Sequence, residues 1–364
     1  MSALHYRTTP VIAAIDRKRR KQIRDSPGDL VLHDNLLKEF PAFEEVEERL
    51  PEGPVGPPSE ALRITAWNLE RCKFLDSSAA VLAQSGGDVH LLSEMDHGMA
   101  RSGQGHKTRE LAERIGCGYL FGVEWLELDI GDERERVLFR GQENDVGFHG
   151  NAILSARRWK RPALIRLETD GFYFEPSRQD RRVGGRAALA ATFEIGGVDV
   201  TCASVHLEAH SDPGIRARQM RALLDGIEIY SPGAPAVIGG DLNTTSLARR
   251  HINRKNRDLP AVSPPELMEA DAHRLVDPVP YEPLFELVAA AGFDWRACNK
   301  LGVATQRTRP DGTPPPPLGR LDWFLTRGMV ATDPRITAAV EPEAGAAISD
   351  HELLAVTVSP VLVA

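Results

Sequence analysis

Residues 236–245 constrain the fold most, because they form a short apolar run that ends in two glycines and continues as Asp-Leu-Asn. The run predicts a buried strand that stops at Gly239 and Gly240. Side chains alternate along a strand, so Asp241 and Asn243 should project the same way from its end. Two oxygen-bearing side chains on one side suit a divalent cation or a phosphoryl group. By itself, Gly-Asp-x-Asn is also common in turns. The rest of the sequence has to decide between a turn and a binding site.

The composition is that of a globular chain. Its 364 residues, 42% hydrophobic and 26% charged, are enough for one large domain or two small ones. A net charge of -8 argues against a surface built entirely for polyanions, although a local basic groove stays compatible with it. Four cysteines without a C-x-x-C pair fit free thiols in a reducing compartment. No apolar run approaches ~18 residues, so we expect no transmembrane helix and a cytoplasmic protein.

The first 60 residues are expected to be a partly helical extension, followed by one domain over residues 61–364. Residues 51–59 are rich in proline and glycine and predict a linker. Residues 16–24 form a basic block. Such a block suits contact with nucleic acid or another acidic surface, and it equally suits a solvated helix face, which is the simpler interpretation.

Two further strand ends carry polar side chains. Residues 62–70 alternate as a strand does and finish on Asn68 and Glu70, and residues 88–96 form an apolar strand that ends with Glu94 and Asp96. Turn preference does not explain both ends, because glutamate is a poor turn residue. Together with the end of the 236–241 strand, they indicate one metal-binding rim.

The segment Gly-Gln-Gly-His-Lys-Thr at residues 103–108 is similar to a phosphate-binding loop. However, His106 separates Gly105 from Lys107, which breaks the Walker pattern. We expect instead a mobile loop beside the site that offers Arg101, His106 and Lys107 to an anionic substrate. Residues 134–142 are strongly charged and are also expected to be loop.

Residues 186–206 predict a β-hairpin that turns at a Gly-Gly pair. Arg186 at its start is either an exposed strand-end charge or a phosphate clamp, for which a planar guanidinium is suited. His206 ends the hairpin. His206 and His210 are four residues apart, but they follow a strand and not a helix, so they do not form the zinc-protease pattern.

The C-terminal part adds a histidine and two carboxylates. Asp322 lies in a predicted strand, and Asp350 and His351 immediately precede the last one. A carboxylate next to a histidine can hold the imidazole in one tautomer. The sequence therefore predicts an oriented histidine near the same rim.

These motifs, taken in order, resemble the endonuclease/exonuclease/phosphatase superfamily, whose members include deoxyribonuclease I-like and exonuclease III-like metal-dependent phosphoesterases. The resemblance spans roughly residues 62–360. It implies a four-layer α/β sandwich, in which two packed mixed β-sheets are flanked by helices and the site lies at one end of the sheets. The motifs that carry it are Trp67-Asn68-x-Glu70, Ser93-Glu94, Ser204-Val-His206, Gly240-Asp241-Leu-Asn243, Leu321-Asp322-Trp and Ser349-Asp350-His351.

The resemblance also implies a metal site for Mg²⁺ or Mn²⁺. Glu94 would be the principal ligand, with Asn68 and Asp350 nearby and Glu70 assisting. Mg²⁺ needs only a few carboxylates because it keeps several waters, so this sparse set of ligands is sufficient.

The resemblance assigns roles to the remaining residues as well. Asp241 would activate or orient the attacking water, and Asn243 would hold the phosphate. His351, steered by Asp322, would contact a non-bridging oxygen or act as the base. His206 would lie across the phosphate as a donor or acid.

We therefore expect a divalent-metal-dependent phosphoesterase that hydrolyses phosphodiester bonds by metal-assisted attack of water. Its substrate would be a nucleic acid, DNA or RNA, or a small or lipid phosphodiester. A hard cation with neighbouring donors stabilises the charge that builds on the phosphoryl oxygens. A phosphomonoesterase on the same site and a non-catalytic binding protein on the same scaffold are the alternatives.

Overall fold

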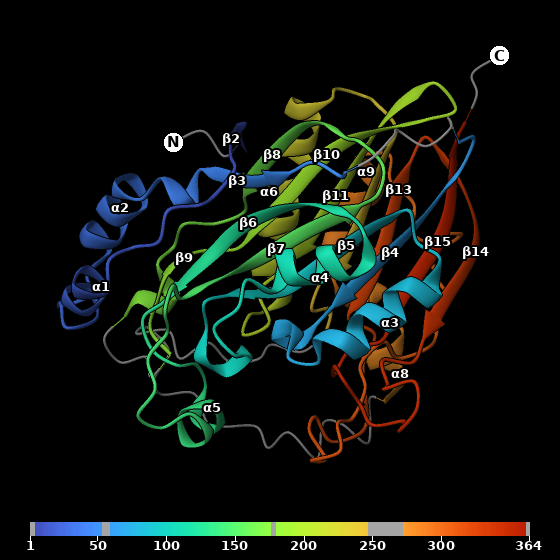
Figure 1. Ribbon diagram of the computed structural model, residues 1–364. Helices are drawn as coiled ribbons and strands as arrows, with labels where there is room; N and C mark the ends of the chain where they lie inside the picture. Colours follow the sequence, from blue (N-terminus) through green and yellow to red (C-terminus); the bar gives the residue numbers. More distant parts are fainter. Residues whose placement is uncertain (1–3, 53–58, 176–179, 247–271, 362–364) are drawn as a thin grey trace.

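The computed structural model describes residues 4–52, 59–175, 180–246 and 272–361. Within these ranges the strands form two mixed sheets, one of six strands and one of nine (Figure 1). The strands of the smaller sheet are β1 (Leu4–His5), β8 (Lys160–Arg166), β10 (Ala187–Ile195), β11 (Val198–His206), β12 (Ala236–Asp241) and β13 (Asp322–Arg327). Those of the larger sheet are β2 (Arg7–Thr9), β3 (Glu45–Arg49), β4 (Leu62–Asn68), β5 (Val89–His97), β6 (Gly118–Glu127), β7 (Phe148–Ser155), β9 (Arg182–Gly184), β14 (Met329–Thr337) and β15 (Leu353–Pro360).

The spatial order of the strands differs from their order in the sequence. The smaller sheet runs β1-β8-β10-β11-β12-β13, and the larger runs β14-β15-β4-β5-β7-β6-β3-β2, with β9 paired to β6. The α-helices of the described chain are α1 (Arg17–Arg24), α2 (Leu30–Glu39), α3 (Leu75–Ser85), α4 (Lys107–Ile115), α5 (Glu133–Leu138), α6 (Pro213–Tyr230), α8 (Ala272–Val276) and α9 (Leu284–Ala290).

Period-two alternation explains why the sheets stack. In β10, Leu189 packs into the core between the two sheets, whereas its neighbours Ala188 and Ala190 face the opposite side, where α6 and α9 pack. The core between the sheets contains side chains of both, such as Leu91 of β5 and Phe324 of β13. Helices therefore cover the outer faces of two packed sheets, and the predicted four-layer α/β sandwich is confirmed.

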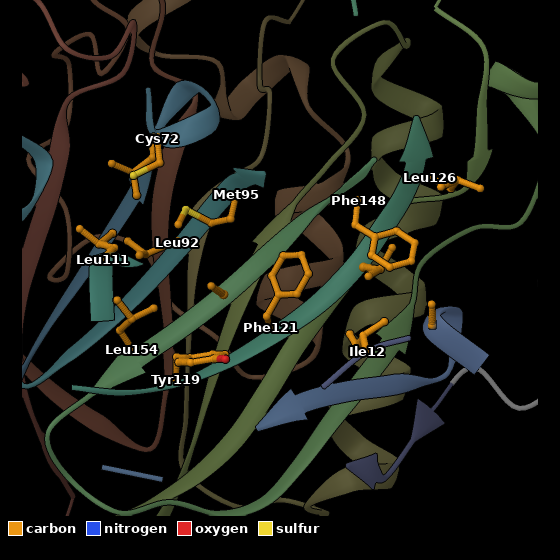
Figure 2. Packing of buried hydrophobic residues seen from close by; sticks show 14 of the residues in the cluster. Ile12, Cys72, Leu92, Met95, Leu111, Tyr119, Phe121, Leu126, Phe148 and Leu154 are labelled. Carbon is orange, nitrogen blue, oxygen red and sulfur yellow. The ribbon is translucent and has the colours of Figure 1, made fainter. Parts of the chain in front are cut away.

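A third hydrophobic cluster lies on the outer face of the larger sheet (Figure 2). Leu111 of α4 and Phe121 of β6 belong to it, and so do Ile12 and Ile23 from the N-terminal segment. In addition, β1 pairs with β8 and β3 pairs with β6, so the first 50 residues contribute strands to both sheets. The predicted linker falls largely on residues 53–58, which lie outside the described residues. A domain boundary near residue 60 stays a prediction.

Strand register brings the polar strand ends together. Parallel pairing of β11 with β12 places His206 opposite Asp241, and antiparallel pairing of β12 with β13 places Asp241 opposite Asp322. In the other sheet, parallel pairing of β4 with β5 places Asn68 opposite Ser93, the residue before Glu94.

Within the described ranges, the structure contains no helix long and apolar enough to cross a membrane.

Candidate active site

A group of buried polar side chains joins the ends of the two sheets. Asn68 donates its Nδ2–H to Asp241 Oδ2 over 3.1 Å, which links β4 to β12. His351 Nδ1 and Asp322 Oδ2 are 2.8 Å apart and share a hydrogen bond. The Nε2 atoms of His206 and His351 lie 3.5 and 3.7 Å from Asp241 Oδ2. Asp241 therefore stands at the centre of this group, 1% exposed.

The local backbone explains how Asp241 reaches this position. Gly240 has φ of 149°, and a Cβ there would meet the carbonyl oxygen of Val205 at 2.0 Å, so only glycine fits. After the strand, Asp241 Oδ1 accepts the Asn243 N–H at 2.8 Å, and Asn243 Nδ2 donates to the carbonyl of Leu207 at 2.9 Å. The turn interpretation of Gly-Asp-x-Asn is therefore correct for one carboxylate oxygen, while the other lies near His206 and His351. A cation or phosphoryl site at this segment stays a prediction.

Glu94 lies beside this group and is held by two donors. Asn68 Nδ2 donates to Glu94 Oε1 at 3.2 Å, and Arg71 Nη1 donates to Oε2 at 2.7 Å. Burial alone would raise the pKa of Glu94, but the Arg71 guanidinium, helped by His206 and His149, holds that pKa well below its usual range. Glu94 is therefore ionised, and its side chain is 17% exposed.

Glu70 and Asp350 lie at the edge of the group. Arg309 forms ion pairs with both carboxylates, and its Nη2 is 3.4 Å from Asp350 Oδ2. The Glu70 N–H donates to Asn68 Oδ1 at 3.1 Å, which ties Glu70 to the site. Burial, followed by repulsion from Asp350, raises the pKa of Glu70. Arg309 was not identified from the sequence, where it is one arginine in a proline-rich segment.

The central groups have shifted pKa values. Burial raises the pKa of Asp241 to about 7, and Asp322 adds to the shift. Burial alone would lower the pKa of His351, but Asp322 and Asp241 keep it well above its usual range. Burial, with Arg186 nearby, lowers the pKa of His206 well below its usual range. The site therefore combines a His351 whose pKa favours the cation, a His206 whose pKa favours the neutral ring and an aspartate of raised pKa.

Arg186 is 5% exposed and lies between two carboxylates. Its Nε is 3.2 Å from Glu208 Oε2, and its Nη1 is 3.4 Å from Glu124 Oε2. The first alternative, an exposed strand-end charge, is therefore wrong. Arg186 lies close enough to His206 to lower its pKa, but its guanidinium is already paired.

The expectation of a mobile substrate-binding loop needs correction. Arg101 lies in the 3₁₀ turn η3 (Ala100–Ser102), is 3% exposed, and donates to both oxygens of Asp96 at 2.9 Å. His106 caps α4, is 2% exposed, and is 2.9 Å from Glu47 Oε1. Lys107, 8% exposed, pairs with Glu110. These residues satisfy charges inside the protein, so the structure does not bring Arg101 or His106 to the site.

Besides Arg309, sequence analysis missed two residues next to the site. Arg71 lies in the turn η2 (Glu70–Cys72) with φ of 69°, and its Nε is 3.2 Å from Glu135 Oε1. Glu135 belongs to α5, although residues 134–142 were expected to be loop. The signal for this helix was present, because Asp132 and Glu135 form a capping box at its start. No pattern in the sequence indicates that Arg71 turns towards Glu94.

The donor chemistry fits a divalent cation. Glu94 and Asp350 offer hard carboxylate oxygens, which Mg²⁺ and Mn²⁺ prefer. Asn68 turns its Nδ2 towards Glu94 while its Oδ1 accepts the Glu70 N–H, so its amide would have to turn over to bind the cation. One oxygen atom each of Asp241 and Asp322 and a ring nitrogen of His351 also lie within 4.8 Å of one another. Because Arg71 already contacts Glu94 Oε2, a cation at Glu94 would compete with this guanidinium.

Comparison with known proteins identifies the family of this chain. The sequence profile described as "Endonuclease/Exonuclease/phosphatase family" matches residues 65–351. Among solved structures, the endonuclease/exonuclease/phosphatase from Beutenbergia cavernae is similar with a TM-score of 0.55 and 19% identity, over 83% of this chain and 72% of that one. The endonuclease/exonuclease/phosphatase from Bacteroides vulgatus is similar with a TM-score of 0.50 and 15% identity, over 82% and 99% of the two chains. At these identities the likeness concerns the fold. No curated protein matches the chain.

Proposed function

This chain belongs to the endonuclease/exonuclease/phosphatase family, which supports a hydrolase of the phosphoesterase type, and on this premise we propose that it is a divalent-metal-dependent phosphodiesterase. The observation that carries the proposal is the group of polar side chains around Asp241. It combines a buried carboxylate, two histidines of different charge and an ionised glutamate at one end of the sandwich. A binding protein has no need for this combination, whereas hydrolysis of a phosphate ester uses each part.

Asp241 is suited to take a proton from the attacking water. Burial raises the pKa of Asp241, which makes this carboxylate a stronger base than a solvated aspartate. The Asn68 amide and the Asn243 backbone N–H hold its two oxygens in place. The carboxylate therefore does not have to reorganise when the water approaches.

His351 and His206 are suited to the phosphoryl oxygens. Asp322 accepts the Nδ1–H of His351, which leaves the Nε2–H free to donate to the oxygens as negative charge builds on them. His206 is neutral and 2% exposed, so it can accept or donate a proton depending on its tautomer. Asn243 lies beside them and is proposed to orient the phosphate.

Glu94, Asn68 and Asp350 are proposed to hold Mg²⁺ or Mn²⁺, with Glu70 assisting. When bound, the cation supplies Lewis-acid stabilisation of the phosphoryl charge. Asn68 contributes in a second way, because its amide links Glu94 to Asp241 and so fixes the position of the metal site relative to the base.

The test is turnover of bis-p-nitrophenyl phosphate, p-nitrophenyl phosphate and plasmid DNA, each with Mg²⁺ and with EDTA. We expect metal-dependent cleavage of the diesters, and Asp241→Ala should lower turnover about 10²-fold or more. Asp199→Ala, an exposed aspartate at the start of β11, is the matched control and should leave turnover unchanged. Absence of metal-dependent turnover of any ester, or equal turnover by Asp241→Ala and wild type, would reject the proposal. Faster cleavage of the monoester would identify a phosphomonoesterase.

A further inference from the structure

The basic block is the helix α1, and its position in the structure is fixed. Six of its eight residues are lysine or arginine, in a chain whose net charge is -8. Ile23 anchors the helix in the outer hydrophobic cluster. Arg20, 8% exposed, donates to the carbonyls of Asn144, Asp145 and Val146 at 2.8–3.0 Å. The helix therefore presents its remaining cations from a rigid support.

These cations line a cavity of about 810 Å³ between α1 and the segment 127–144. Seven arginine or lysine side chains and four carboxylates face it, together with amide and aliphatic groups. Three cations, Lys18, Lys21 and Arg140, are exposed and form no ion pair with a carboxylate of the described chain. The cavity therefore carries a surplus of positive charge that the structure leaves unneutralised.

The four carboxylates do not cancel this surplus. Asp16 accepts two backbone N–H groups at the start of α1, and Glu127 pairs with the buried Arg101. Glu143 and Asp129 make exposed or long contacts, 3.3 Å with Arg17 and 3.8 Å with Arg24. Ion pairs of this kind contribute little to stability, so Arg17 and Arg24 can exchange these carboxylates for an incoming phosphate.

Two consecutive residues of α5 link the cavity to the candidate active site. Glu135 of α5 is buried and pairs with Arg71, the residue that holds Glu94. The next residue, Arg136, lines the cavity. One short helix therefore contacts the candidate site through Glu135 and the cavity through Arg136.

We propose that this cavity binds the phosphate backbone of a single-stranded nucleic acid whose scissile phosphate lies in the candidate active site. The inference rests on the proposed function, because it names the substrate class of that site. Lys18 and Lys21 stand about one helical turn apart, so they can contact separate phosphates of one strand. The cavity is walled by α1 on one side and by the segment 127–144 on the other, which suits one flexible strand better than a rigid duplex. Because charged, amide and aliphatic groups line it, recognition is of phosphates and not of base identity.

Fluorescence anisotropy with a labelled oligothymidylate of about 20 nucleotides tests this, since single-strand grooves span ~4–16 nucleotides. The measurement is made in EDTA, so that no substrate is consumed. Lys18→Glu/Lys21→Glu should bind at least about 10-fold more weakly than wild type, and the slope of log K against log salt should fall by about 1.4 for two phosphate contacts. The matched control, Lys38→Glu/Arg221→Glu, reverses two exposed charges on α2 and α6 and should bind as wild type.

The inference is overturned if the cavity variant and the control variant bind the oligothymidylate equally tightly and unfold at the same temperature. It is also overturned if the wild-type protein does not bind the oligothymidylate at low salt. Equally tight binding of poly-L-glutamate would overturn it in favour of an acidic protein partner. Turnover of bis-p-nitrophenyl phosphate with Mg²⁺ keeps the two proposals distinguishable. The cavity variant should retain that turnover. If the wild-type protein shows no such turnover, the proposed function is rejected, and the binding measured in EDTA still tests the cavity by itself.

Discussion

Replacing Arg71 with methionine should tighten the binding of a divalent cation at Glu94. In the structure Arg71 Nη1 is 2.7 Å from Glu94 Oε2, and the two side chains are 20% and 17% exposed. A hydrogen bond between charged groups contributes about 1.5–3 kcal/mol. A cation that takes this oxygen has to displace the guanidinium, and methionine removes that competitor while filling much of the space. Since 1.4 kcal/mol is tenfold in affinity, the Kd should fall about 10- to 100-fold.

Isothermal titration with Mn²⁺ in the absence of substrate measures this effect directly. Arg71→Lys, which keeps the charge but loses the planar fork, should change the Kd less than Arg71→Met does. Without metal, Arg71→Met should unfold at a lower temperature, because Glu94 is left without its main partner, and Mn²⁺ should restore more stability to it than to wild type. An Arg71→Met protein that binds Mn²⁺ no more tightly than wild type would refute the competition between Arg71 and the metal.

Two further predictions concern buried charges. Glu47→Gln should lower the free energy of unfolding at neutral pH, because Glu47 accepts hydrogen bonds from Ile12, His106 and Tyr119. Burial raises the pKa of Glu47, but these hydrogen bonds outweigh burial and lower that pKa from 4.5 to about 2. The ionised Glu47 therefore contributes about 3 kcal/mol to the free energy of unfolding. This contribution is complete above pH 4.5 and is lost as the pH falls towards 2. Urea unfolding across that range should show the two proteins converging, and a constant gap would contradict the assignment. Arg101→Met should cost about 3–5 kcal/mol of stability by leaving buried carboxylates unpaired, whereas unchanged stability with a raised KM would instead support a role in substrate binding.

Much of the fold follows from patterns that act over a few residues. Alternation and a Gly-Gly turn predict the hairpin of β10 and β11. The predicted stop at Gly239 and Gly240 is wrong, because β12 runs through both glycines to Asp241. One local signal was overlooked: the capping box at Asp132 and Glu135 marks α5, but the high charge of the segment suggested a loop.

The contacts of charged side chains could not be predicted in the same way. In sequence, Arg101, Arg186 and Arg71 look alike, each an arginine near a strand end. In the structure Arg101 neutralises a buried group around Asp96, Arg186 lies between Glu124 and Glu208, and only Arg71 reaches Glu94. The sequence around a charged residue looks the same whether its side chain is solvated or buried. Its burial depends on partners that include residues tens of positions away in the sequence.

The sequence by itself therefore determined which polar side chains stand at strand ends, because side chains alternate along a strand and these residues follow the apolar run of each strand. The same local patterns placed Asp241, Asn243 and His351 beside their strands. Only the tertiary structure decided which of these groups meet, because Asp241 contacts Asn68, His206 and His351 through the register of two strand pairs and the packing of two sheets. Register and packing are set by hydrophobic contacts over the whole domain, and no short stretch of residues encodes them.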